Sequence, residues 1–227
     1  RLQVGYFGGE PLLSWDLLQQ LQLRARQLAR EKNVPLKGTV TTNATLLTDE
    51  RMDWLVGHDV VVGISIDGVQ AAHDHNRRFA GGASSFEAAR RGLKIALSRA
   101  PLTETITVTD PSNVRTLADS VRFLLDEGVG VLSFNVNVRA AWDEPLLAEY
   151  ERQVERIGDE FIRRFRAGQD VYIGAIDAKI IGHLKRGLKD CDKCSFGVRE
   201  VSFAPSGNIY PCERLVGDDT DPRWRIG

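Results

Sequence analysis

The sequence predicts an α/β fold in which parallel strands form a partial (β/α)6 barrel of the TIM type. Strand-like and helix-like stretches alternate along most of the chain, and such units are joined by right-handed crossovers between parallel strands. Several strands carry apolar side chains on one face and small polar side chains on the other. This division suits an outer helix layer around a partly open interior, and it favours a partial barrel over an open doubly wound sheet or a closed barrel.

The expected strands cover residues 2–7, 38–42, 60–67, 105–109 and 131–138. In the third strand, the apolar face holds Val60, Val62, Ile64 and Ile66, and the polar face holds Gly63, Ser65 and Asp67. The fifth strand alternates in the same way as far as Val138. In the fourth strand, the same reasoning places Thr105, Thr107 and Thr109 toward the interior and Ile106 and Val108 toward the helices.

Helices are expected between these strands. The first has Ser14 available as its N-cap and an apolar stripe made of Leu17, Leu21, Ala25, Leu28 and Ala29. Thr48 begins a short second helix whose first turn is acidic, as the helix dipole favours. A capping box at residues 84–87 opens a helix that ends near Arg99. Further helices are expected near residues 117–125, stopped by Gly128, and at 146–165.

The pattern changes after residue 168, and three regions are expected. Residues 1–168 form the barrel core, 169–190 a linker with a short helix, and 191–227 a small cysteine-containing domain. In this tail, a turn at residues 205–208 joins two short strands into a hairpin. The chain opens directly in a strand and ends at Gly227 without a stop signal, so we expect it to be a piece of a longer protein.

The composition favours a protein that acts on neither nucleic acid nor membranes. The chain has 31 acidic and 30 basic residues, so its charge is nearly balanced. None of its apolar runs approaches the roughly 18 residues of a membrane-spanning helix. Three cysteines, two of them spaced C-x-x-C, argue against a secreted disulfide framework. A reducing, cytoplasmic location and metal ligation are therefore expected.

Polar motifs follow the first two strands. Gly8 and Gly9 let the backbone turn tightly at a strand end and approach a ligand closely, and Glu10 then offers a carboxylate suited to an ammonium group. A tight turn with a solvated carboxylate is the alternative. After the second strand, Thr42 and Asn43 offer polar groups that equally fit an Asx turn ahead of a helix.

The third strand ends with Ser65 and Asp67, which point the same way and fit the diol of a ribose. Downstream, Arg77 or Arg78 is placed to fold back onto a ligand carboxylate. A charged surface loop is the alternative for this segment. His73 and His75 lack a third ligand at suggestive spacing, which disfavours a metal site.

Taken in order, F-G-G-E-P-L-L, T-N-x-T-L-L, S-I-D-G and H-D-x-N-R resemble radical S-adenosylmethionine enzymes over residues 2–140. The similarity points to the branch that modifies peptides and proteins, which includes anaerobic sulfatase-maturating enzymes and ribosomal-peptide maturases. The resemblance implies that Gly8, Gly9 and Glu10 bind the methionine amino group of S-adenosylmethionine. Ser65 and Asp67 would approach its ribose and Arg77 its carboxylate, with Asn43 nearby in the same site.

That family holds its [4Fe–4S] cluster through a C-x-x-x-C-x-x-C segment after the first strand. This chain has no such motif, and its first strand corresponds to the second strand of the family. The resemblance therefore implies a barrel missing its first unit, with the cluster ligands outside this sequence. As it stands, the segment is not expected to cleave S-adenosylmethionine.

The tail resembles the opening of a SPASM domain, a small domain that carries auxiliary iron–sulfur clusters. The resemblance implies that Cys194 and Cys212 are ligands of an auxiliary [4Fe–4S] cluster, with Cys191 as an uncertain third. A structural zinc site or free thiols are the alternatives. Glu213 matches the position of a catalytic base in the sulfatase-maturating relatives, or it is a solvated hairpin residue. Thr41 stands where those relatives often carry a Gln that contacts the peptide, and this departure favours a peptide modification other than sulfatase maturation.

The implied function is an oxidoreductase that modifies a peptide or protein through a 5′-deoxyadenosyl radical, with flavodoxin or ferredoxin as electron donor. One rival is a non-catalytic, peptide-binding partial barrel whose tail is stapled by zinc. Another is a phosphate-binding hydrolase or lyase that uses Gly8 and Gly9 as an anion cradle. The carboxylate of Glu10 would repel a phosphate there, which disfavours this last reading.

Overall fold

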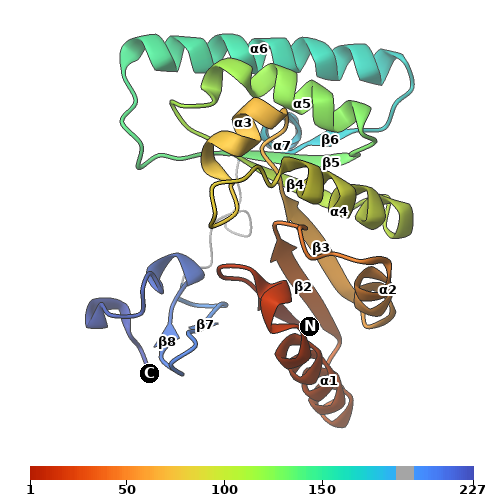
Figure 1. The fold of residues 1–227 in the computed structure, drawn as a ribbon, viewed down its shortest axis with the longest axis vertical. Coiled ribbons are helices and arrows are strands. Elements are labelled where there is room, and N and C mark those ends of the chain that lie inside the picture. The colour runs from red at the N-terminus through yellow and green to blue at the C-terminus, as the bar shows by residue number, and fades with distance from the viewer. Residues whose placement is uncertain (188–196) are drawn as a thin grey trace. The chain divides into compact units, whose positions relative to one another are not determined.

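The structure is a computed structural model, drawn in Figure 1, and it describes residues 1–187 and 197–227. The described chain divides into two compact units, Arg1–Ala178 and Lys179–Gly227. In the part of the chain that is described, none of the helices is both long enough and apolar enough to cross a membrane.

Six parallel strands form the sheet of the first unit. They are β1 (Leu2–Tyr6), β2 (Leu36–Thr42), β3 (Val60–Ser65), β4 (Glu104–Thr109), β5 (Val131–Val136) and β6 (Tyr172–Ile173). Each strand pairs with the next in sequence order, and within the described residues β1 and β6 remain the two edges. The predicted parallel α/β fold is confirmed, and an open sheet of this order is consistent with a partial barrel. The sixth strand lies in the segment that was expected to be a linker.

Helices connect the strands. The α-helices are α1 (Trp15–Glu31), α2 (Asp49–Gly57), α3 (Gln70–Asn76), α4 (Phe86–Arg99), α5 (Leu117–Asp126), α6 (Glu144–Arg166) and α7 (Gly174–Leu184). Short 3-10 turns, η1 (Pro11–Ser14) and η2 (Val114–Thr116), precede α1 and α5. The helix α3 was not predicted, because its seven residues, Q-A-A-H-D-H-N, lack an apolar stripe.

The hydrophobic core lies between the sheet and its helices. Buried strand residues such as Val62, Ile64 and Leu132 pack there with Leu93 of α4 and Leu124 of α5. The opposite face of the sheet is less covered: Val61 is 43% and Val108 36% exposed. The helices thus cover one face of the sheet and leave the other less covered.

The orientation predicted for β4 is wrong. Thr105, Thr107 and Thr109 are buried on the helix-covered face, while Val108 lies on the open face. The register explains this, because Thr105 pairs between Ile64 and Leu132, whose side chains belong to the core. Threonine and valine have nearly the same shape, so alternation within β4 did not reveal which face is buried. In the described part of the chain, the Thr105 and Thr109 hydroxyls are buried without hydrogen-bonding partners.

The apolar stripe predicted for α1 is wrong for its leucines. Leu17, Leu21 and Leu28 are 55%, 50% and 39% exposed, while Ala29 is buried as predicted, together with Leu18 and Gln22. The cause is polar: the Gln22 amide donates to the His58 carbonyl at 2.8 Å and accepts from the Tyr6 hydroxyl at 2.9 Å. These bonds turn the helix by about one residue and leave an apolar row exposed along α1.

Helix ends differ from expectation at two places. Ser14 stands at the start of α1 but makes no capping hydrogen bond. The capping box expected at residues 84–87 is not seen: α4 begins at Phe86, so Ser85 stands at the N-cap position, and its side chain makes no capping bond. The Ser84 hydroxyl instead accepts from the Phe86 amide at 3.3 Å. Thr48 does cap α2, accepting from the Arg51 amide at 3.3 Å. The expected fifth strand ends at Val136, and Val138 is exposed beyond it.

Two glycines allow helices to approach the loops that follow the strands. A Cβ atom on Gly68, whose φ is +92°, would lie 2.1 Å from the Cβ of Ser120 in α5. A Cβ atom on Gly92 of α4 would lie 2.1 Å from the Ala44 carbonyl oxygen. Neither position accepts a side chain unless the backbone moves.

The second unit contains the predicted hairpin. Strands β7 (Ser202–Phe203) and β8 (Ile209–Tyr210) pair antiparallel. The end of the chain lies along β8, because the Ile209 amide donates to the Gly227 carbonyl and the Ile226 amide donates to the Ile209 carbonyl. The buried Tyr210 donates its hydroxyl to Asp219 at 2.7 Å. Bonds from Ser206, Tyr210 and Asn208 lower the pKa of Asp219 to about 2, which keeps this acceptor ionised.

Candidate cofactor-binding site

The polar motifs of the sequence follow neighbouring parallel strands. Residues 7–10 follow β1, residues 43–47 follow β2, and residues 66–68 follow β3. Since the strands are parallel and adjacent, their carboxyl ends share one edge of the sheet, which is where α/β proteins bind ligands. The sheet therefore brings the predicted groups to one edge.

Gly8 and Gly9 form an open turn at the end of β1. Gly8 has a φ of +141°, a conformation that other residues rarely adopt. A Cβ atom on either glycine would meet nothing within 4 Å among the described residues. The space beside this backbone is therefore free for a ligand.

Glu10 joins the first two strand ends. Its Oε1 accepts from the Leu12 amide at 3.0 Å and from the Thr42 hydroxyl at 2.7 Å, and its Oε2 accepts from the Asn43 amide at 2.8 Å. The side chain is half-buried and also caps η1. Because all three donors are neutral, they fix the carboxylate in place and leave its negative charge uncompensated.

Asn43 and Thr41 differ in how free their side chains are. The Asn43 Oδ1 accepts from the amide and the hydroxyl of Thr45 at 3.0 and 2.8 Å, which is the Asx turn considered from the sequence. Asn43 thus meets Glu10 through its backbone. Thr41 lies half-buried on the open face of the sheet, in register with Gly63.

Ser65 and Asp67 end β3 in different environments. Ser65 is half-buried on the open face, and among the described residues its hydroxyl has no hydrogen-bonding partner. Asp67 is only 2% exposed, and it accepts from the Arg77 Nε at 2.7 Å, the Arg77 Nη2 at 3.3 Å and the Val108 amide at 3.1 Å. The carboxylate of Asp67 is thus occupied by contacts within the fold, whereas the Ser65 hydroxyl is not, among the described residues.

The Asp67–Arg77 ion pair was not foreseen, although both residues were singled out. The two are brought together by the turn and helix α3 that lie between them in the sequence. The Arg77 side chain is 26% exposed, while its partner Asp67 is almost fully buried. An acidic and a basic residue ten positions apart, one before and one after a short helix, would have been a usable sequence signal for this ion pair.

A buried histidine lies behind this pair. The His73 Nδ1 lies 3.4 Å from the Asp67 amide nitrogen, and its Nε2 lies 3.0 Å from the Ser85 hydroxyl. Burial lowers the pKa of His73, against the attraction of Asp67, which favours the neutral ring. His73 is thus a buried residue that makes hydrogen bonds within the fold, whereas His75 on the same helix is exposed.

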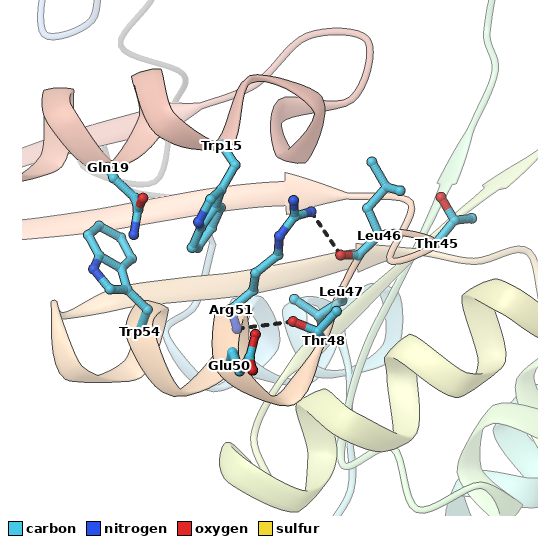
Figure 2. A pocket seen from close by; sticks show the side chains of 9 residues that line it. All are labelled: Trp15, Gln19, Thr45, Leu46, Leu47, Thr48, Glu50, Arg51 and Trp54. Atoms are coloured by element: carbon cyan, nitrogen blue, oxygen red, sulfur yellow. Dashed lines mark hydrogen bonds between the residues drawn. The ribbon is translucent and has the colours of Figure 1, made fainter.

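A pocket of about 720 Å3 lies between α1 and α2, and its lining was not predicted (Figure 2). Figure 2 shows Arg51 beside Trp15, with its guanidinium 5.1 Å from the ring centroid. The Arg51 Nη1 donates to the carbonyls of Leu12 and Leu46 at 3.3 and 2.9 Å. Arg51 therefore ties the loop after β1 to the loop after β2 from outside.

The second unit carries its own cluster of polar groups. The ligand atoms of Glu200, Cys212 and Glu213 lie within 4.8 Å of one another. A hydrogen bond between the two carboxyls raises the pKa of Glu200 and lowers that of Glu213. Burial raises the pKa of the Cys212 thiol. Cys191 and Cys194 lie outside the described residues.

The comparisons with known proteins agree on one group of relatives. No protein-family model matches the chain. The cysteine-type anaerobic sulfatase-maturating enzyme of Clostridium perfringens is 22% identical over 236 residues, covering 97% of this chain and 60% of the relative. The serine-type anaerobic sulfatase-maturating enzyme of Bacteroides thetaiotaomicron is 33% identical over 94 residues, 40% of this chain and 22% of the relative. The chain thus spans less than two thirds of these proteins.

Solved structures show the same fold. Native anSMEcpe with bound AdoMet matches 99% of this chain and 63% of its own length, with a TM-score of 0.83 and 18% identity. SuiB of Streptococcus suis, bound to its precursor peptide SuiA, matches 96% of this chain and 50% of its own length, with a TM-score of 0.64 and 17% identity. The resemblance predicted from the sequence motifs is confirmed.

Proposed function

We propose that this chain is the S-adenosylmethionine-binding core of a radical enzyme that modifies a peptide or protein. One observation carries the proposal: Glu10 follows β1, Ser65 ends β3, and Arg77 follows α3 and pairs with Asp67 just beyond β3. Among the described residues they offer an anion, a hydroxyl without a hydrogen-bonding partner and a cation. S-adenosylmethionine carries an ammonium, a ribose and a carboxylate that match these groups. The sulfatase-maturating relatives and the solved structures with bound AdoMet or peptide support the assignment.

Each residue would position one part of the cosubstrate. The fixed, uncompensated carboxylate of Glu10 attracts the ammonium, beside the open turn of Gly8 and Gly9. Ser65 donates to or accepts from the ribose. Arg77 meets the carboxylate with the part of its guanidinium that Asp67 does not occupy. Asp67 holds Arg77, and Asn43 holds Glu10 through its backbone.

Bound next to a reduced [4Fe–4S] cluster, S-adenosylmethionine supplies a 5′-deoxyadenosyl radical that takes a hydrogen atom from the substrate. The chain itself contributes binding, orientation and shielding. An electron donor of the flavodoxin or ferredoxin kind and a cytoplasmic location complete the proposal. The cluster ligands would come from a strand–helix unit that precedes β1. The exposed row of Leu17 and Leu21 on α1, together with the edge of β1, offers an apolar surface for such a unit.

The tail would hold an auxiliary iron–sulfur cluster. Cys212, with Cys194 and Cys191, supplies thiolates for it, and a ligated metal would reverse the raised pKa of the Cys212 thiol. Glu213 has a lowered pKa and is therefore ionised, as a base for the substrate must be. In the rival proposal, the same tail holds zinc and the barrel only binds a peptide. Metal analysis of the anaerobically purified intact protein separates the two: iron with sulfide supports the enzyme, and zinc alone supports the rival.

The variant Glu10→Ala tests the proposed site in the intact, cluster-loaded protein. Its affinity for S-adenosylmethionine, measured by equilibrium dialysis, should fall at least about 10-fold, because the ammonium loses its charged partner. Formation of 5′-deoxyadenosine should fall with it. The control is Glu87→Ala, which removes an exposed carboxylate on α4 and should leave binding unchanged. Unchanged binding in Glu10→Ala would remove Glu10 from the site.

A further inference from the structure

Arg77 is held by its main chain as well as by its side chain. It follows the last turn of α3, where its amide donates to the His73 carbonyl at 2.8 Å. Its carbonyl accepts from the Ser85 hydroxyl at 2.6 Å, and its guanidinium pairs with Asp67. Three separate contacts thus fix the residue that would bind the cosubstrate carboxylate.

These contacts close into a ring of hydrogen bonds. From Arg77 the ring runs through the Ser85 hydroxyl to the His73 Nε2, from the His73 Nδ1 to the Asp67 amide, and from the Asp67 carboxylate back to Arg77. All members except Arg77 are buried. The ring joins the end of β3, helix α3 and the start of α4.

The proton positions in the ring follow from the number of donors. The Ser85 hydroxyl has one proton, which it gives to the Arg77 carbonyl, so it must accept from His73. The proton of the neutral His73 ring is therefore on Nε2. Its unprotonated Nδ1 can then accept a hydrogen bond from the Asp67 amide. Each group has one consistent role, so the ring has a single arrangement of donors and acceptors.

We propose that Ser85 and His73 are positioning residues for Arg77, and that they set its guanidinium for the carboxylate of S-adenosylmethionine. This inference rests on the proposed function. A free arginine side chain loses rotamer freedom when a ligand fixes it. With the backbone of Arg77 anchored by Ser85 and its guanidinium by Asp67, most of that loss occurs on folding and not on binding.

The chain offers a matched control in the neighbouring serine. Ser84 lies in the same loop, and its hydroxyl donates to the Asp74 carboxylate at 2.8 Å and accepts from the Phe86 amide at 3.3 Å. It is therefore as well bonded as Ser85. Its contacts do not include Arg77, so its loss reports only the general effect of weakening the loop.

The experiment compares two ligands in the intact, cluster-loaded protein. The probes are S-adenosylmethionine and its decarboxylated analogue, which keeps the ammonium and the ribose but lacks the group that Arg77 would bind. In Ser85→Ala, the affinity for S-adenosylmethionine should fall about 5- to 10-fold, the effect of one lost hydrogen bond. The affinity for the analogue should stay within about twofold, and Ser84→Ala should change neither affinity by more than that.

Two further variants complete the test. In an Arg77→Met background, Ser85→Ala should have no additional effect on S-adenosylmethionine binding, because the group that it positions is gone. Ser85→Cys, which keeps the side-chain volume and donates weakly, should show the same selective loss if Ser85→Ala does not fold. Equal losses for both ligands, or none for either, would overturn the positioning role. If the wild-type protein binds neither ligand, the proposed function fails and this inference fails with it.

Discussion

Glu10 and Asp67 are both acidic residues at the ends of strands in the same sheet, yet the structure treats them in opposite ways. Glu10 is half-buried, and its partners in the described part of the chain are all neutral, two amides and a hydroxyl. Asp67 is almost fully buried, and two of its three bonds come from the cation Arg77. The charge of the Glu10 carboxylate therefore remains available to a ligand, while the charge of Asp67 is neutralised by Arg77.

The difference shows how one sheet edge can present both signs of charge. A buried carboxylate without a counter-ion is strongly destabilising, so Asp67 requires Arg77. The pair in turn leaves part of a guanidinium facing outward. A half-buried carboxylate such as Glu10 is tolerated with polar donors alone, because water still reaches it. An amino acid ligand, with an ammonium and a carboxylate, is the kind of molecule that needs both.

The largest expected effect comes from breaking the buried pair. Asp67→Ala should lower the free energy of unfolding by about 3–5 kcal/mol, because it leaves Arg77 and the Val108 amide without their partner. Urea denaturation followed by circular dichroism measures this loss. Glu87→Ala breaks a 3.8 Å surface contact with Arg90 and should change the same quantity by less than about 0.5 kcal/mol. If Asp67→Ala lowered the free energy of unfolding no more than Glu87→Ala does, the pair would not anchor the end of β3.

A smaller effect is expected at the neutral-donor carboxylate. Glu10→Gln should lower the free energy of unfolding by about 1–2 kcal/mol, because its amide group cannot accept from both the Thr42 hydroxyl and the Asn43 amide. The same denaturation assay applies, with the exposed substitution Glu87→Gln as its control. If Glu10→Gln were as destabilising as Asp67→Ala, the contrast between the two carboxylates would be lost.

The smallest effect on stability is expected at Arg51, which links the loops after β1 and β2. Arg51→Lys keeps the charge but cannot span the Leu12 and Leu46 carbonyls while lying against Trp15 (Figure 2). It should lower the free energy of unfolding by about 0.5–1 kcal/mol. It should also speed hydrogen exchange of the Asn43 amide that Glu10 accepts. Arg24→Lys, on the exposed face of α1, should do neither.

Much of the fold could be predicted because helix and strand periodicity are local properties. The errors arose where distant partners decided the outcome. In β4, the threonines are buried because of their register with Ile64 and Leu132, which alternation inside one strand does not contain. In α1, the polar Gln22 is buried through bonds to Tyr6 and His58, while Leu17 is exposed. Residue polarity alone predicts the opposite for that helix.

The site could be predicted in its parts but not in its connections. The motifs located Glu10, Ser65, Asp67 and Arg77, and the structure places the first three at or just beyond the ends of β1 and β3, with Arg77 after α3. That Asp67 pairs with Arg77 depends on the unpredicted helix α3. Ser84 was expected to open a capping box with Glu87, but α4 begins one residue later, and the hydroxyl of Ser85 at its N-cap donates to the Arg77 carbonyl. A serine offers the same hydroxyl for either use, so the sequence pattern alone does not distinguish them.

Gly68 shows that part of a ligand-binding motif can serve the scaffold. With its φ of +92° and only 2.1 Å between a hypothetical Cβ and that of Ser120, it sets how close α5 lies to the loop after β3. The Ser120 hydroxyl also accepts from the Val69 amide at 3.2 Å. Anyone grafting this loop onto another barrel would have to transplant Gly68 and Ser120 together. A screen that randomised only the ligand-facing positions would miss this dependence and return misfolded libraries.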